Sequence, residues 1–64
     1  MKSEIADVPM RVVNWTNRAL LAEAEDESEH WLPFSLVEIE GRLERGRVVT
    51  VSMPQWMAEE RGLV

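Results

Sequence analysis

The sequence predicts a β-rich α+β fold: a small five-stranded antiparallel meander or SH3-like barrel with one short C-terminal helix. Short runs of β-branched and aromatic residues recur along the chain, as strands require. Glycines and acidic residues separate these runs at close intervals, which favours a strongly twisted sheet that curls into a barrel. Helix start and stop signals follow in residues 52–64. At 64 residues the chain makes one small domain with a thin stability margin.

The first strand is expected to begin where the composition changes, after Pro9. Residues 1–9 are mixed in character, so we interpret them as a loose N-terminal leader and residues 10–64 as a single β-rich domain. Residues 10–15 have the β-branched and aromatic content of a strand. Thr16 and Asn17 then suit a tight turn.

Residues 18–25 are open to two interpretations. Their alternation fits a strand, whereas their alanine, leucine and glutamate content also fits a helix. We prefer the strand because residues 29–32 are too short to do anything but pair with a neighbour across the acidic turn 26–28. Pro33 lacks an N–H group and is expected to interrupt that next strand, with residues 34–35 forming a corner.

The second half of the chain carries the clearer strand signals. In residues 36–40, valine and isoleucine alternate with glutamate, the period-two pattern of a half-buried strand. Residues 41–46 form a turn flanked by glycines, and residues 47–51 are the strongest strand signal in the sequence. These two runs complete the five strands.

The C-terminal helix has residues suited to both of its ends. Ser52 is the expected N-cap, with Gln55 three positions later, and Pro54 suits a first turn whose N–H groups lack partners. Gly62 is placed to end the helix in a left-handed conformation. Trp56 is expected to point back at the core.

Composition excludes several classes of protein. With twelve acidic and seven basic residues, the net charge of −5 argues against direct nucleic-acid binding, which relies on cations that neutralise phosphates. The chain has no cysteine for a disulfide or a thiolate metal site, and no apolar run long enough for a membrane span. We therefore expect a soluble cytoplasmic protein whose field favours a basic partner.

Candidate catalytic chemistry is sparse. His30 is the only side chain with an unperturbed pKa suited to acid–base work near neutrality, and a dyad with Ser28 or Ser35 lacks a local turn that would supply an oxyanion hole. The acidic run 25–30 lacks the glycine and the ligand spacing of a calcium loop. The sequence therefore predicts no enzyme, no cofactor and no specific metal site.

Carboxylates are concentrated on the first hairpin and on the strand and turn after it. If adjacent strands align, their outward faces form one acidic surface able to imitate the phosphate track of a nucleic acid. The hairpin acids expected to bind a partner are Glu23, Glu25, Asp26, Glu27 and Glu29, and the surface continues through Glu38, Glu40 and Glu44. The alternative is an ordinary solvent face on which arginines pair across the strands, namely Arg18, Arg42, Arg45 and Arg47.

The aromatic residues are assigned by position. Trp31 and Trp56 are expected in the core, because so small a domain needs large side chains to close its interior. Trp15 falls at a strand end where an indole is often half exposed, and tryptophan is enriched at interaction hot spots. Together with Phe34, Trp15 is the expected apolar anchor of a partner interface.

Two clusters carry a resemblance to small phage and prophage proteins. Residues 31–35, Trp-Leu-Pro-Phe-Ser, and residues 54–63, Pro-Gln-Trp-Met-Ala-Glu-Glu-Arg-Gly-Leu, resemble the Trp-x-Pro-x-Ser corner and the Pro-x-Trp-x-Ala-x-x-x-Gly-Leu tail of that group. The likeness covers roughly residues 17–63, and it departs at Phe34, where a polar residue is expected. It implies a mobile-element setting and no particular reaction.

The resemblance and the acidity together lead to two hypotheses. The first is a non-catalytic interaction protein, in its most concrete form an anti-CRISPR-like inhibitor in the host cytoplasm, that binds a basic surface of a protein handling nucleic acid. The second is a small homodimeric structural or accessory protein of a mobile element, in which exposed strand edges pair.

Overall fold

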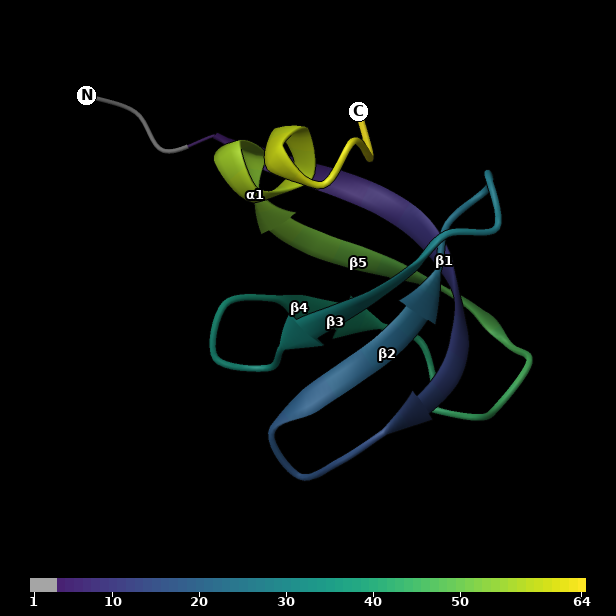
Figure 1. Cartoon of the computed structure of the whole chain (residues 1–64). Helices are drawn as coiled ribbons and strands as arrows, with labels where there is room; N and C mark the ends of the chain where they lie inside the picture. The colour runs from purple at the N-terminus through teal and green to yellow at the C-terminus, as the bar shows by residue number, and fades with distance from the viewer. Residues whose placement is uncertain (1–3) are drawn as a thin grey trace.

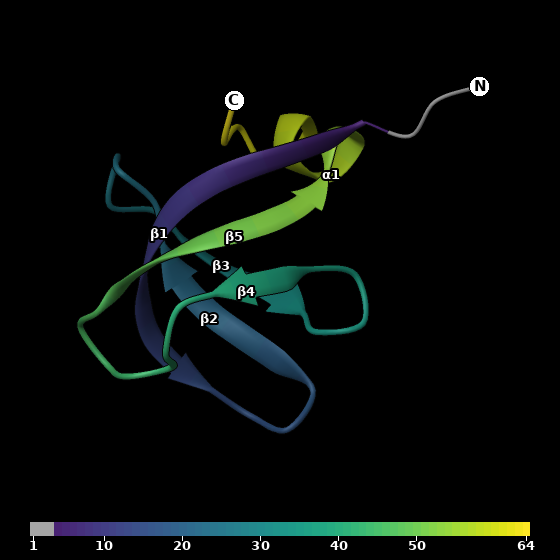
Figure 2. The ribbon, with the colours of Figure 1, turned by 180° about the vertical axis from the view of Figure 1, so that it is seen from behind.

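The computed structural model describes residues 4–64 as one antiparallel sheet with a short helix (Figure 1). The elements are β1 (Ile5–Trp15), β2 (Ala19–Glu23), β3 (Glu29–Pro33), β4 (Glu38–Glu40), β5 (Val48–Pro54) and α1 (Gln55–Glu60). The strand order is β3-β2-β1-β5-β4. Neighbours in sequence pair except β3 and β4, and the pairing of β1 with β5 joins the two halves into a curled, barrel-like sheet (Figure 2). The predicted β-rich fold is confirmed.

The first strand begins earlier than the sequence suggested. β1 starts at Ile5 and pairs with β5 through Pro9, so the prediction of a loose leader is wrong for residues 5–9, while residues 1–3 lie outside the described residues. Even-numbered residues of β1 hydrogen-bond toward β5, as the amide of Val12 does with the carbonyl of Arg47 at 2.9 Å. The nitrogen of Pro9 therefore faces the other side, where β2 has already ended, and no ladder bond is lost.

The ambiguous segment 18–25 forms a strand rather than a helix. β2 pairs on both sides, and Thr16 organises the turn before it: its Oγ1 accepts hydrogen bonds from the amides of Arg18 and Ala19, both at 3.1 Å. The turn expected at residues 16–17 is thereby confirmed. A sheet position with neighbours on both sides outweighs the helix propensity of alanine and leucine.

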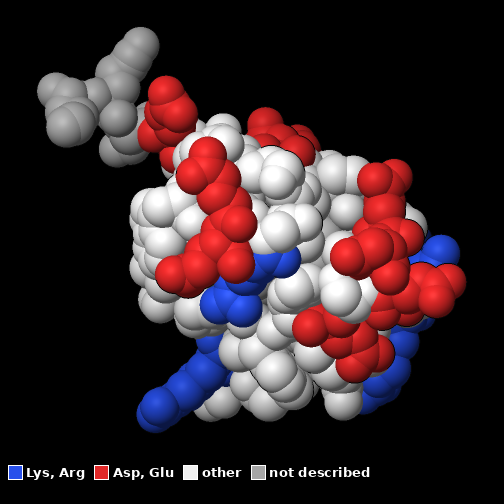
Figure 3. Space-filling model, turned by 45° about the horizontal axis from the view of Figure 1, so that its top comes forward, with Lys and Arg blue, Asp and Glu red and all other residues white. Residues whose placement is uncertain are grey.

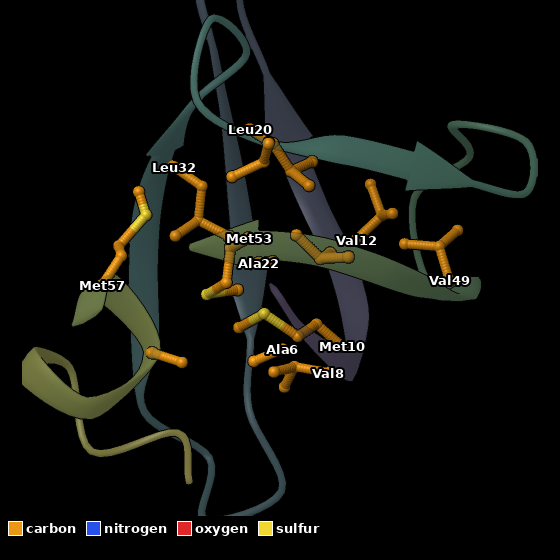
Figure 4. Packing of buried hydrophobic residues seen from close by; sticks show 13 residues of the cluster. Ala6, Val8, Met10, Val12, Leu20, Ala22, Leu32, Val49, Met53 and Met57 are labelled. Atoms are coloured by element: carbon orange, nitrogen blue, oxygen red, sulfur yellow. The ribbon is translucent and has the colours of Figure 1, made fainter. Parts of the chain in front are cut away.

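The core consists of aliphatic and methionine side chains from four strands and the helix (Figure 4). The largest fully buried side chains are Met10, Leu20, Leu32, Met53, Met57, Val12 and Val51. The expectation that Trp31 and Trp56 lie in the core is wrong, since their exposed fractions are 49% and 57%. In each case the next residue faces inward, Leu32 after Trp31 and Met57 after Trp56. Flexible methionines fill the irregular interior instead of indoles.

The helix ends as predicted but starts differently. Pro54 occupies the N-cap position and no side chain caps the first turn. Ser52, the expected N-cap, is still in β5 and donates its hydroxyl proton to Asp7 Oδ1 at 2.6 Å. At the other end, Gly62 has φ 71°, and the amide of Leu63 bonds to the carbonyl of Ala58 at 2.8 Å. The left-handed glycine stop is confirmed.

Candidate interaction surface

The acidic residues of the first hairpin lie at its tip, where the chain turns from β2 to β3. The turn is closed by the amide of Ala24, which bonds to the carbonyl of Ser28 at 2.8 Å, and by the amide of Glu27, which bonds to the carbonyl of Ala24 at 2.9 Å. Glu25, Asp26 and Glu27 are exposed in it. Glu29 is also exposed at the start of β3, and Glu23 is half-buried at the end of β2. The turn therefore presents carboxylates on an ordered backbone.

A chain of hydrogen bonds holds the turn in shape. Asp26 Oδ1 accepts from the amide of Ser28 at 3.0 Å and from its hydroxyl at 2.5 Å, and Ser28 Oγ lies 2.8 Å from His30 Nε2. The hydroxyl has one proton, and it goes to Asp26, so the imidazole acts as the donor to Ser28. Ser28 and His30 do meet, but the proton points away from the imidazole, opposite to a nucleophile and its base. The arrangement stabilises the turn.

The pKa of Asp26 is lowered below its ordinary value of 3.8, mainly because the Ser28 hydroxyl and then the Ser28 amide donate to the carboxylate. A depressed carboxyl pKa contributes stability above the unfolded-state pKa, and that contribution is lost as the pH falls through the folded-state pKa. We expect Ser28→Ala to return the Asp26 pKa toward 3.8, as followed by NMR titration of the carboxyl carbon. An unchanged pKa in that variant would contradict the assigned hydrogen bonds.

One residue of the turn has a strained backbone. Glu27 has φ 70°, the left-handed region that costs a residue with a Cβ atom about 1 kcal/mol. Glu27→Gly is therefore expected to raise the free energy of unfolding by up to about 1 kcal/mol, offset in part by the entropy of glycine in the unfolded chain. Urea unfolding measures the change. Glu25→Gly, at a neighbouring position without a positive φ, is the control and is expected to destabilise.

The hairpin carboxylates have no paired cations in the described chain. Within residues 4–64 the ion pairs both involve Glu44, with Arg47 at 3.0 Å and Arg42 at 3.8 Å, in the loop between β4 and β5. Arg45 lies over the Trp15 ring at 5.4 Å and donates to Asn14 Oδ1 at 3.0 Å. The arginines of this loop are thus engaged with their own surroundings. The basic residue beside the hairpin is Arg11 of β1, which lies opposite Glu23 and forms no ion pair with it within 4.0 Å.

The acidic surface is divided rather than continuous, contrary to the expectation that adjacent strands would align it. β3 and β4 are the two edges of the sheet, and they do not pair. Glu38 of β4 lies opposite Ser52, which lies opposite Asp7, so the β4 acids group with β1 and β5. Figure 3 shows acidic side chains in separate groups over the face that carries α1 and the 24–28 turn. The hairpin tip is one of these groups.

The predicted aromatic anchors are not the exposed ones. Trp15 and Phe34 are half-buried and pack against the core. The exposed aromatic of the hairpin is Trp31, which lies opposite Leu21 on the outward face of β2 and β3. The alternation of side chains along a strand could have predicted the exposure of Trp31, because only one of Trp31 and Leu32 can face inward. Leu32 is the inward residue, opposite the buried Leu20.

No three His, Cys, Asp or Glu side chains among residues 4–64 come together as a metal site would require. The described part of the chain also contains no helix long and apolar enough to span a membrane. Comparison with known proteins finds no matching family model, no similar curated protein and no similar solved structure.

Proposed function

We propose that this protein is a non-catalytic interaction protein whose acidic hairpin binds a basic surface on a protein that handles nucleic acid. One observation carries the proposal: the 24–28 turn holds exposed carboxylates on a hydrogen-bonded backbone with no cation paired to them within residues 4–64. The phage-like setting, and an anti-CRISPR-like inhibitor as its concrete form, rest on the resemblance of residues 31–35 and 54–63.

The physical basis is charge complementarity. A groove that binds nucleic acid concentrates lysine and arginine to neutralise phosphates. A cluster of carboxylates at the tip of a narrow hairpin, on a chain of net charge −5, is attracted into such a groove from a distance. Fixing the turn in advance lowers the entropy cost of binding. The protein then competes with nucleic acid for the groove without any chemical step.

A homodimer is the second candidate, favoured by the two free edges of the sheet. β3 and β4 each have one side without a partner strand, and an exposed edge is a template for pairing with another chain. A solution mass that rises with protein concentration supports this candidate, together with a concentration-dependent melting temperature.

Affinity capture from host extract tests the proposal. Tagged protein is incubated with extract at low salt, washed with rising salt, and the eluted proteins are identified by mass spectrometry. We expect a nucleic-acid-handling protein that elutes as salt increases, because counter-ions screen the attraction. Recovery of the bait alone, with a solution mass that is a multiple of the chain, would favour the homodimer instead.

A further inference from the structure

We propose that the free edge of β3 receives an extended segment of the basic partner as an added antiparallel strand, with a lysine or arginine opposite Glu29 and an apolar residue opposite Trp31. This inference rests on the proposed function for the charge of the partner. The inference goes beyond the proposed function by naming a second contact, separate from the 24–28 turn, and the chemistry of the segment that binds there.

The outer side of β3 has no neighbouring strand. β3 is the first strand in the sheet order, and no Cα atom of β3 lies within 8 Å of a Cα atom of β4, the strand that follows it in the chain. Figure 1 shows β3 running beside β2. An open edge of this kind binds extended peptides through main-chain hydrogen bonds.

The hydrogen-bond pattern shows which backbone groups face that edge. The register of β2 and β3 continues at both ends, where the amide of Ala24 bonds to Ser28 and the amide of Phe34 bonds to Arg18, each at 2.8 Å. Even-numbered residues of β3 therefore bond to β2. The N–H and C=O groups of Glu29 and Trp31 point outward, because bonded pairs alternate along an antiparallel ladder.

Pro33 fits the same pattern. Its position is odd, so its nitrogen faces the free edge and β3 can include it without losing a bond to β2. Pro33 was expected to interrupt the strand, and it is instead the last residue of it. An added strand is consequently limited to the donors of Glu29 and Trp31, which fixes where the segment sits.

The outward face of the edge defines the side chains that match it. Trp31 is half exposed beside Leu21, its cross-strand partner, and offers an apolar surface. Glu29 lies directly opposite Glu23, and no lysine or arginine nitrogen lies within 4.0 Å of either carboxylate in the described residues. Glu23 has Arg11 of β1 as its other cross-strand neighbour, whereas Glu29 at the edge faces no cation. Like charges directly opposite each other are destabilising. A cation on the added strand relieves that repulsion, and an apolar side chain two positions earlier covers Trp31.

A second copy of the chain is a poorer occupant of this edge. Each copy has a net charge of −5, so two copies repel. A pairing centred on Glu29 also places two carboxylates opposite each other. A pairing centred on Trp31 places Glu29 opposite Pro33, which supplies no donor and no cation. A pairing centred on His30 places Glu29 opposite Trp31, which completes the hydrogen bonds but leaves Glu29 without a cation. A basic segment satisfies both the charge and the hydrogen bonds.

Amide hydrogen exchange of the full chain, followed by NMR, tests the proposal. The probe is a short peptide of threonine residues with the sequence Ile-Thr-Arg at its centre. The control peptide has Ile-Thr-Glu at the same positions. At a probe concentration about nine times its Kd, exchange at Glu29 and Trp31 is expected to slow about tenfold, because it then proceeds only from the free protein. His30 and Leu32, already bonded to β2, serve as internal references. The glutamate peptide is expected to leave all four rates unchanged.

A chemically synthesised chain with an N-methyl group on the Trp31 amide removes one outward donor and leaves the bonds to β2 intact. We expect the methylated chain to keep slow amide exchange at Leu32. We expect the arginine peptide no longer to bind to it. Unchanged exchange at Glu29 and Trp31 with the probe overturns the proposal, as does equal binding by the methylated chain. Protection that grows with protein concentration alone overturns it in favour of self-pairing. If reversing the charges of Glu25 and Glu27 still weakens the binding of a captured partner, the proposed function is retained in any of these cases.

Discussion

Leu32→Ala is expected to lower the free energy of unfolding by about 2–5 kcal/mol. Leu32 has no exposed surface, and its side chain meets that of the equally buried Leu20 across β2 and β3. Figure 4 places it beside Met57, the residue through which α1 covers the core. A core of this size rarely supplies more than about 3–5 kcal/mol of stability, so the variant is expected to be largely unfolded at room temperature.

Urea unfolding followed by circular dichroism measures the loss. Leu36→Ala is the matched control: it removes the same atoms from a leucine that is 45% exposed in the turn between β3 and β4, and its cost is expected to stay within about 0.5 kcal/mol. Leu32→Met keeps the volume and is expected to cost less than about 1.5 kcal/mol. Equal losses for Leu32→Ala and Leu36→Ala would mean that the inward face of β3 is not the one described.

Local patterns were sufficient to predict the elements in the second half of this fold. The alternation of residues 36–40, the β-branched run 47–51 and the glycine after the helix each reflect a constraint contained within a few residues. Gly62 is the clearest case, because a left-handed stop depends only on the missing Cβ atom. These constraints are local, and they place the elements of the second half of the chain within a few residues of their observed bounds.

What the sequence did not predict depends on which strands become neighbours. Pro9 looked like the end of a leader, yet it is tolerated within β1 because β2 ends before reaching it. The acids of β3 and β4 were expected to merge, and they are separated because those strands are the two edges of the sheet. Trp31 and Trp56 were expected in the core on grounds of size, whereas the register of β3 places Leu32 there and the inward side of α1 places Met57 there. Register is a property of the assembled sheet.

The charges of the turn are expected to control the rate at which the protein finds its partner. Reversing Glu25 and Glu27 to lysine replaces carboxylates at the exposed tip, and it leaves Asp26 in place because that residue accepts the hydrogen bonds of Ser28. Electrostatic steering raises association rates by about 10- to 1,000-fold, so the double variant is expected to bind the captured partner at least about tenfold more slowly at low salt. Surface plasmon resonance over a range of salt concentrations measures it.

The control reverses the same number of charges away from the hairpin, at Glu38 and Glu40 of β4, which are exposed and lie on the other edge of the sheet. If the turn itself enters the basic groove, this pair is expected to slow association by much less, because its field is screened beyond about 10 Å at 0.1 M salt. Equal losses from both pairs would show that only the net charge matters. The hairpin would then make no specific contact with the groove. A local contact requires that reversing the hairpin charges slows association more than reversing the β4 charges.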